Sequence, residues 1–162
     1  GLAIGFTIYK FVKFEINKWD TIESIKMKDL IVTRTEVCKL INDYKNNSIK
    51  LFEQKADIEE TFFPKRTPKD GKIDLNNDMI DIYNLIRGTT RPFPGSFLEY
   101  GDSNVILWDA VPFDTKLDFS SHEVGEIVDF FDGKFILKLV DGVLLVKDFK
   151  CDKRLKKGVI LV

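Results

Sequence analysis

The chain has 162 residues, of which 44% are hydrophobic and 12% aromatic, so it has enough apolar material for a folded core and is not a disordered chain. Its 25 Lys and Arg residues against 26 Asp and Glu give a net charge of −1, which excludes a general electrostatic attraction to nucleic acid. Cys38 and Cys151 are too far apart to form a metal-ligand spacing, and no apolar run is long enough to cross a bilayer. We therefore expect a cytoplasmic protein without a signal peptide or a membrane segment.

The N-terminal part predicts a strand followed by a long helix. Residues 6–16 are rich in aromatic and β-branched residues with Lys and Glu between them, which favours an extended segment. Asp20 and Glu23 stand three residues apart, a variant of the capping box that begins a helix. Apolar residues then recur from Ile25 to Tyr44, and Asn46-Asn47 ends the pattern. A strand and a capped helix form only the last part of an α/β unit, whose partner strands are missing.

A proline-punctuated basic segment follows at residues 63–75. Pro64 and Pro68 exclude a helix or strand interior, and Asp70-Gly71 is a turn pair. Asp74 or Asn76 is expected to cap a helix over residues 76–88, which ends at Gly88. The apolar positions of this helix follow helical spacing: Met79, Ile80, Ile82, Tyr83 and Ile86.

From Phe97 onward the pattern changes to short strands separated by turns. Asp132-Gly133 and Asp141-Gly142 each lie between two apolar runs, a strong hairpin signal. Five or six antiparallel strands in so short a segment predict a small open barrel. The expected strands cover residues 97–100, 105–111, 124–130, 135–140, 143–149 and 159–162.

Three linked motifs resemble the folate-dependent formyltransferases, the family of methionyl-tRNA formyltransferase and the amino-sugar N-formyltransferases. They are Phe63–Asp74, Ile86-Arg87-Gly88 and Pro92–Phe97, in the order and at the spacing of that family. The resemblance implies an α+β chain with three parts. Residues 1–60 would be the C-terminal part of a Rossmann-like formyltransferase domain, contributing a strand and a long helix. Residues 61–96 would be a linker with a helix, and residues 97–162 a small antiparallel OB-like β-barrel.

The same resemblance places none of the family's catalytic groups on this chain. Gly1–Gly5 resembles the stretch that carries the catalytic aspartate, and Ala3 falls at that position. The catalytic asparagine and histidine and the residues that bind 10-formyltetrahydrofolate, the implied cofactor, belong upstream. The lone histidine, His122, lies in a polar loop without a nucleophile nearby, and no metal-ligand motif is present. Whether the chain is part of an active enzyme is left open.

The implied activity is transfer of a formyl group to an amine. Residues 97–162 carry nine Lys and Arg against twelve Asp and Glu, which argues for a small acceptor rather than a polyanion. The form Arg91-Pro-Phe-Pro-Gly resembles the amino-sugar enzymes, so a nucleotide-linked amino sugar is the expected acceptor and nucleic acid is not. Methionyl-tRNA formyltransferase is the first alternative, and a non-catalytic remnant or interaction module is the second. A homodimer is left open.

Candidate substrate-binding residues lie in the linker. Guanidinium groups match phosphate oxygens, and an aromatic ring stacks on a base. The candidates are Lys65, Arg66, Arg87 and Arg91 for a diphosphate, and Phe93, with Phe63, for stacking. The alternative is structural: the arginines tie down the linker and the phenylalanines pack in the core.

Overall fold

A computed structural model describes residues 7–53 and 61–162. The chain divides into two compact units. The first, called the N-terminal unit here, comprises Gly1–Asp20 and Ser24–Lys65, and the second, called the sheet unit, comprises Thr21–Glu23 and Arg66–Val162. Each is described by itself.

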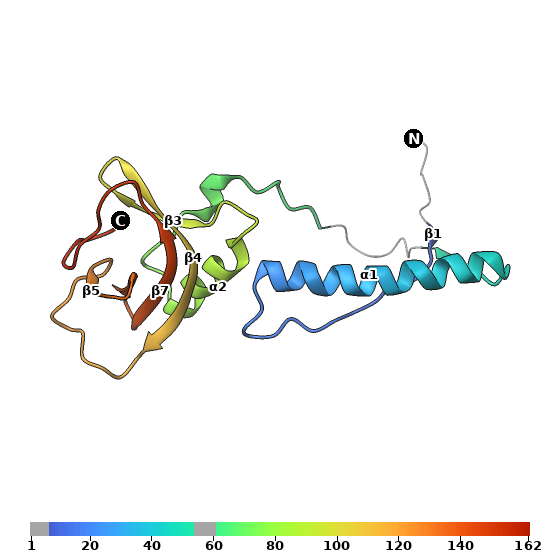
Figure 1. The fold of residues 1–162 in the computed structure, drawn as a ribbon, viewed down its shortest axis with the longest axis horizontal. Helices are drawn as coiled ribbons and strands as arrows, with labels where there is room; N and C mark the ends of the chain where they lie inside the picture. Colours follow the sequence, from blue (N-terminus) through green and yellow to red (C-terminus); the bar gives the residue numbers. More distant parts are fainter. Residues whose placement is uncertain (1–6, 54–60) are drawn as a thin grey trace. The chain divides into compact units, whose positions relative to one another are not determined.

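The N-terminal unit consists mainly of one long helix. Helix α1 spans Ile22–Lys45, close to the predicted range, and no residue in it is buried. The segment before it runs along the helix (Figure 1), and Val12 and Phe14 share a shallow groove with residues of α1. A strand was predicted over residues 6–16, but the structure has only the two-residue strand β1 (Thr7–Ile8) there, so the prediction is wrong for residues 9–16. The partner strand in the described chain, β2 (Phe52–Glu53), is also only two residues long. None of the described helices has the length and apolar character needed to span a membrane.

Asp20 stabilises the start of α1 through contacts that differ from the predicted capping box. Its side chain is 2% exposed and accepts hydrogen bonds from the backbone N–H of Asn17 (2.7 Å) and the hydroxyl of Ser24 (2.8 Å). The ammonium group of Lys28 forms an ion pair with the same carboxylate. The hydrogen bond from Lys28, followed by those from Asn17 and Ser24, lowers the pKa of Asp20 to about 2.

The sheet unit is built on five antiparallel strands in the order β3-β4-β7-β6-β5 (Figure 1). Asp132 and Gly133 join β5 to β6 with φ angles of 50° and 72°, the left-handed pair that a two-residue hairpin turn requires. Register shifts along β4, where it pairs with β7, bend this long strand and curve the sheet. The strands are β3 (Ser96–Tyr100), β4 (Ser103–Asp114), β5 (Ile127–Phe131), β6 (Lys134–Lys138) and β7 (Val143–Lys150).

The OB-like barrel expected from the sequence is not confirmed, because β3 and β5, the two edge strands of the sheet, are not paired with each other. The predicted last strand at residues 159–162 is not a strand. Instead, this segment exchanges backbone hydrogen bonds with both edges: Val162 pairs with Glu99 of β3, and Leu161 donates to Gly125, just before β5. The result is a curved antiparallel sheet with one helix, a mixed helix and sheet architecture.

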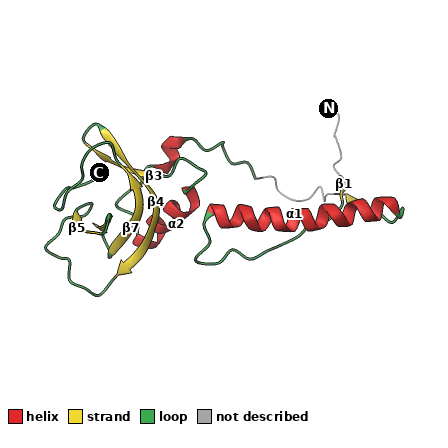
Figure 2. Ribbon diagram, viewed as in Figure 1, coloured by secondary structure: helices red, strands yellow, loops and turns green. Residues whose placement is uncertain are grey.

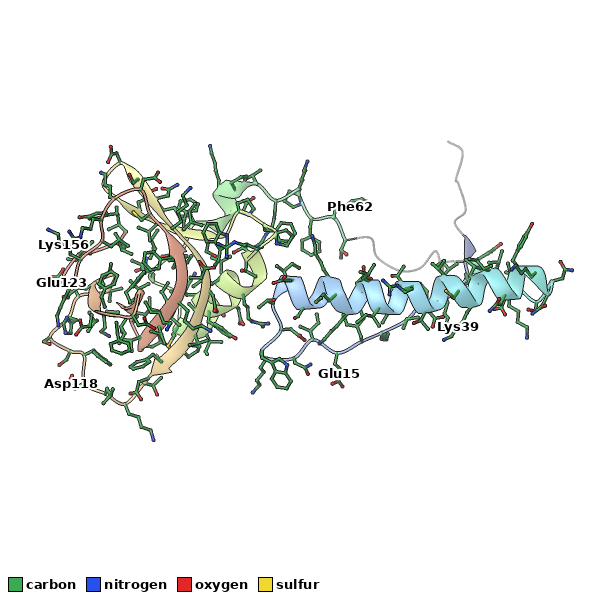
Figure 3. The ribbon with its side chains drawn as sticks, viewed as in Figure 1. Glu15, Lys39, Phe62, Asp118, Glu123 and Lys156 are labelled. Atoms are coloured by element: carbon green, nitrogen blue, oxygen red, sulfur yellow. The ribbon has the colours of Figure 1, made fainter. Side chains whose placement is uncertain are left out.

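The core lies inside the curve of the sheet, where side chains crowd together in Figure 3. Phe135 is completely buried, with its ring centroid 4.8 Å from that of Phe149 in an edge-on arrangement. Helix α2 (Met79–Thr89) packs mainly on β4 and adds Met79, Ile82 and Ile86 to this core. These three positions are among those that the helical spacing predicted.

The N-terminus of α2 is capped from a distant turn. Neither Asp74 nor Asn76 is its N-cap residue; Asp74 instead accepts hydrogen bonds from Asn76. Asp78 occupies the N-cap position but makes no side-chain cap bond, while Asp141 accepts the backbone N–H of Met79 at 2.8 Å. The predicted cap is therefore wrong, because a residue 62 positions away satisfies the first helical donor.

Candidate functional site

A pocket of about 210 Å³ lies in the sheet unit, where the proline-rich segment meets the end of α2. One wall is formed by the segment at and before the short 3₁₀ helix η1 (Pro68–Gly71), drawn in red in Figure 2, and the other by the loop after α2. We call it the linker pocket. It is lined by Arg66, Thr67, Pro68, Asp70, Gly71, Gly88, Thr89, Phe93, Pro94 and Gly95.

Two glycines allow the walls of the linker pocket to approach closely. A Cβ atom on Gly71 would lie 2.6 Å from the carbonyl oxygen of Gly95. Gly95 has a φ of 93°, and a Cβ atom there would lie 2.7 Å from Ile106 and 2.9 Å from Nε1 of Trp108. Only glycine satisfies both the backbone conformation and the spacing at position 95. The shape of the pocket therefore requires glycine at positions 71 and 95.

A buried pair of hydroxyl groups fixes the end of α2 beside the pocket. The hydroxyls of Thr89 and Ser96 lie 2.7 Å apart, and that of Thr89 also donates to the carbonyl of Leu85. Ser96 is completely buried and begins β3. This contact ties the last turn of the helix to the first strand, so the loop between them is held at both ends.

Asp70 places a carboxylate on the pocket wall in a fixed orientation. Its Oδ2 accepts hydrogen bonds from the backbone N–H of Thr67 at 2.5 Å and from the Thr67 hydroxyl at 3.0 Å. The backbone hydrogen bond, then the hydroxyl, lowers the pKa of Asp70, so the group is ionised near neutral pH. The sequence prediction treated Asp70 only as a turn residue. The spacing of Thr67 and Asp70, that of a capping box, is the signal that identifies it.

The structure brings two of the predicted site residues together in one pocket. Arg66 and Phe93 both line the linker pocket, and the Phe93 side chain is 43% exposed. Lys65 belongs to the N-terminal unit, so its position relative to the pocket is not described. Phe63, 88% exposed, belongs to that unit too, as does Phe62, which is labelled in Figure 3.

Arg87 and Arg91 make structural contacts outside the pocket lining. Arg87 donates to Oδ1 of Asn84 at 2.8 Å, and its guanidinium lies 5.6 Å from the ring centroid of Tyr83. Arg91 is ion-paired with Asp148 and stacks on Trp108, with its central carbon 4.0 Å from the ring centroid. These contacts favour the structural alternative for both arginines.

Ala3 and His122 are the two positions with an expected or possible link to catalysis. Ala3 lies outside the described residues. His122 is half-buried, and its Nδ1 lies 2.9 Å from Oε1 of Glu126, whose pKa this hydrogen bond lowers. Residues 7–53 and 61–162 contain no group of three or more His, Cys, Asp or Glu side chains arranged to hold a metal ion.

Comparison with known proteins identifies the family to which this chain belongs. Residues 65–157 match the model of the formyl transferase C-terminal domain. The chain is a member of this family. The match covers more than half of the chain and includes every residue of the linker pocket. The formyltransferase resemblance seen in the three linked motifs is thereby confirmed.

Two curated relatives of the formyltransferase C-terminal domain carry different names. One is the bifunctional polymyxin resistance protein ArnA of Wigglesworthia glossinidia brevipalpis, 42% identical over 71 residues, which are 43% of this chain and 10% of that protein. The other is the methionyl-tRNA formyltransferase of Ruminiclostridium cellulolyticum, 28% identical over 130 residues, 79% of this chain and 41% of that protein. The chain thus spans well under half the length of both relatives, and together they leave the acceptor unresolved.

Solved structures support the fold of this formyltransferase domain. Two crystal structures of HypX variants from Aquifex aeolicus are similar, with TM-scores of 0.68 and 0.57 at 17% and 19% identity. They are matched over 84% and 72% of this chain and over 24% and 20% of their own length. At this identity the likeness concerns the fold alone.

Proposed function

We propose that this chain is the C-terminal portion of a 10-formyltetrahydrofolate-dependent N-formyltransferase that acts on the amine of a nucleotide-linked amino sugar. The observation that carries the proposal is the linker pocket, in which family motifs bring Arg66 and Phe93 onto one cavity. A guanidinium and an exposed aromatic ring are the two groups that recognise a phosphate and a base. The protein would act in the cytoplasm.

The charge of the sheet unit supports a small acceptor over transfer RNA. Within residues 97–162, the locally basic segment is 147–157, which has six Lys and Arg side chains. Three of them are ion-paired with aspartates on the same unit: Lys147 with Asp109 at 2.8 Å, Lys157 with Asp129 at 3.2 Å, and Lys153 with Asp102. Each ion pair neutralises a lysine charge, which weakens the electrostatic attraction of this segment for a polyanion such as transfer RNA.

In this proposal the formyl donor, 10-formyltetrahydrofolate, binds outside the linker pocket. A ligand pocket for a complete drug-sized molecule has a volume of about 300–1,000 Å³, so a cavity of about 210 Å³ is too small for a whole folate. When bound elsewhere, 10-formyltetrahydrofolate would supply the formyl group. The residues of this chain would instead bind and orient the acceptor.

The N-terminal unit fits the last part of a Rossmann-like domain. Helix α1 has no buried residue, and Leu30, Ile31 and Ile41 expose about half or more of their side chains. An apolar helix face of this kind is normally covered by a sheet. The catalytic asparagine and histidine would belong to the remainder of that domain, and Ala3 would stand at the position of the aspartate.

Hydrogen–deuterium exchange on the full chain tests this function. Amino sugars linked to UDP, dTDP, GDP and CMP are added singly, and we expect at least one to protect residues 65–91. Arg66→Ala should abolish the protection, whereas Arg154→Ala, on the exposed basic segment, should not. Absence of protection by every member of the panel contradicts the proposal.

Methionyl-tRNA formyltransferase remains the second candidate because a relative of that name matches 79% of the chain. It predicts salt-sensitive binding to initiator tRNA. A shift of this tRNA in a gel at low salt, lost at 200 mM salt, would favour it over the sugar enzyme. A chain that binds neither ligand would be a non-catalytic module of the family.

A further inference from the structure

The chain contains three Asp-Gly pairs, Asp70-Gly71, Asp132-Gly133 and Asp141-Gly142, and all of them lie in the sheet unit. An aspartate before a glycine can close into a cyclic imide, because glycine has no side chain to obstruct attack by its backbone nitrogen on the carboxyl carbon. The reaction requires a carboxyl group that is free to move and a peptide unit that can rotate toward it. Since the three pairs share the same chemistry, their surroundings decide which of them reacts.

The structure protects the pair at residues 70 and 71. Oδ2 of Asp70 accepts hydrogen bonds from the backbone N–H of Thr67 at 2.5 Å and from its hydroxyl at 3.0 Å. Gly71 is buried, and its packing against Gly95 leaves no room for a Cβ atom. Rotation of the peptide unit between Asp70 and Gly71 would disturb both sets of contacts.

The pair at residues 141 and 142 is protected by different contacts. Oδ1 of Asp141 accepts the backbone N–H of Met79 at 2.8 Å, so an imide there would remove the cap of α2. The carbonyl of Gly142 accepts the N–H of Leu139 at 2.9 Å. A Cβ atom on Gly142 would lie 3.2 Å from the carbonyl oxygen of Asp114, which shows how closely this backbone is packed.

The pair at residues 132 and 133 has no comparable protection. The Asp132 side chain is 76% exposed, and its one contact with a described residue is an ion pair with Lys134 at 3.2 Å. Such an exposed pair holds a carboxylate only weakly. Gly133 is exposed, has open space where a Cβ atom would lie, and makes no hydrogen bond through its N–H within residues 61–162. Rotation of this peptide unit, at the tip of the β5–β6 hairpin, moves no packed group.

We propose that Asp132 is a site of isoaspartate formation. The nitrogen of Gly133 forms a bond to Cγ of Asp132 and the C–O bond of the carboxylic acid breaks, so that the amide proton and the hydroxyl leave together as water. Water then opens the five-membered imide. Breaking the bond from nitrogen to Cγ restores aspartate, whereas breaking the bond to the original backbone carbonyl leaves a chain that runs through Cβ and Cγ. The reaction needs no cofactor, and the proposal does not depend on the acceptor of the formyl group.

Isoaspartate at this position would weaken the β5–β6 hairpin. The new linkage adds a methylene group to the main chain within a two-residue turn, and that turn sets the register of the two strands. Phe131 pairs with Lys134 directly beside the turn, and Phe130 pairs with the buried Phe135 one step further. We therefore expect the amides of β5 and β6 to exchange hydrogen faster after the modification.

Incubation of the full chain at 37 °C over several weeks, followed by chromatography and mass spectrometry of its peptides, tests the proposal. An isoaspartate peptide has an unchanged mass and a different retention time, and the imide is lighter by one water. We expect isoaspartate to form at Asp132 at least about tenfold faster than at Asp70 or Asp141, because those two react only after local opening. In concentrated urea the three rates should become similar. Equal rates in the folded chain, or the same preference in urea, would overturn the proposal.

A substitution at the turn supplies the second test. Asp132→Gly removes the carboxyl group and keeps a Gly-Gly pair that suits a two-residue hairpin turn. Isoaspartate is counted by an isoaspartyl methyltransferase, which transfers a labelled methyl group from S-adenosylmethionine to the new carboxylate. Incubated Asp132→Gly should lose most of the label and the faster exchange of β5 and β6. The control Asp152→Ala changes an exposed aspartate that does not precede glycine and should keep both. Full labelling of Asp132→Gly would show that the modification occurs elsewhere.

Discussion

The guanidinium of Arg91 lies over the indole ring of Trp108, with its central carbon 4.0 Å from the ring centroid. Its ion pair with Asp148 adds a second attachment, on the neighbouring strand β7. Trp108 in turn lies against Gly95, because a Cβ atom at that position would be 2.9 Å from its Nε1. Arg91 and Trp108 therefore hold both ends of the loop that forms one wall of the linker pocket.

Replacing Arg91 should destabilise the sheet unit. A cation–π contact at an exposed site is worth about 0.5–1 kcal/mol and an exposed ion pair about 0–1 kcal/mol. We therefore expect Arg91→Ala to lower the free energy of unfolding by about 1 kcal/mol, measured by urea unfolding followed through tryptophan fluorescence. Arg154→Ala, which removes an exposed arginine that makes no described ion pair, should change it by less than about 0.5 kcal/mol. Equal effects of the two variants would show that the Arg91 contacts contribute nothing.

Because α2 is capped by a distant residue, Asp141 and Asp78 should contribute unequally to the free energy of unfolding. Asp141 accepts the N–H of Met79, whereas Asp78 occupies the N-cap position without a side-chain cap bond. Loss of a capping side chain costs about 0.5–2 kcal/mol. Asp141→Ala should therefore reduce the free energy of unfolding by about that amount in a denaturant titration, and Asp78→Ala by clearly less. The reverse order would mean that the local residue, not the distant one, satisfies the helix.

Two glycines at opposite ends of the same loop should respond oppositely to alanine. Gly95 has a φ of 93° and no room for a Cβ atom, so Gly95→Ala should cost about 1–3 kcal/mol from backbone strain, with a further cost from overlap with Ile106. Gly88 lies in the last turn of α2 with open space around the position of a Cβ atom. Gly88→Ala should raise the melting temperature, since alanine in a helix is favoured over glycine by about 0.5–1 kcal/mol. Calorimetry of the two variants under one condition measures both, and a tolerated Gly95→Ala would contradict the described wall.

Local patterns were sufficient to predict most elements of this chain. The alternation and the Asp-Gly turns correctly indicated the hairpin strands, since each strand's register is set by a turn adjacent in sequence. Helical spacing likewise identified both helices and the buried positions Met79, Ile82 and Ile86. For the site, Arg66 and Phe93 were both named as candidates from the motifs, and both line the linker pocket, while the proposed roles of the two residues stay predictions.

What the sequence did not predict depends on contacts between distant residues. Asp141 caps a helix 62 positions earlier, and Arg91 pairs with a strand 57 positions later, so no local pattern contains either contact. The last segment, residues 159–162, has the composition of a strand, yet it forms only a few hydrogen bonds with each edge of the sheet. Whether a short apolar segment becomes a strand depends on how its partners are placed, which composition does not encode.

Asp20 should make the stability of the N-terminal unit depend on acid pH. Its pKa is about 2 in the folded chain against an ordinary value of 3.8, so the unfolded state binds the proton more readily. The stabilisation is therefore complete above about pH 4 and is lost as the pH falls from about 4 toward 2. Helicity followed by circular dichroism over this range should show the loss, and Asp20→Asn should be less helical at pH 6 and less sensitive to acid. The control is Asp29→Asn, which changes an exposed carboxylate on the same helix and should keep the acid sensitivity. If the helicity of Asp20→Asn instead falls with pH in the same way as that of the unsubstituted chain, the contacts of Asp20 with Lys28, Asn17 and Ser24 do not stabilise α1.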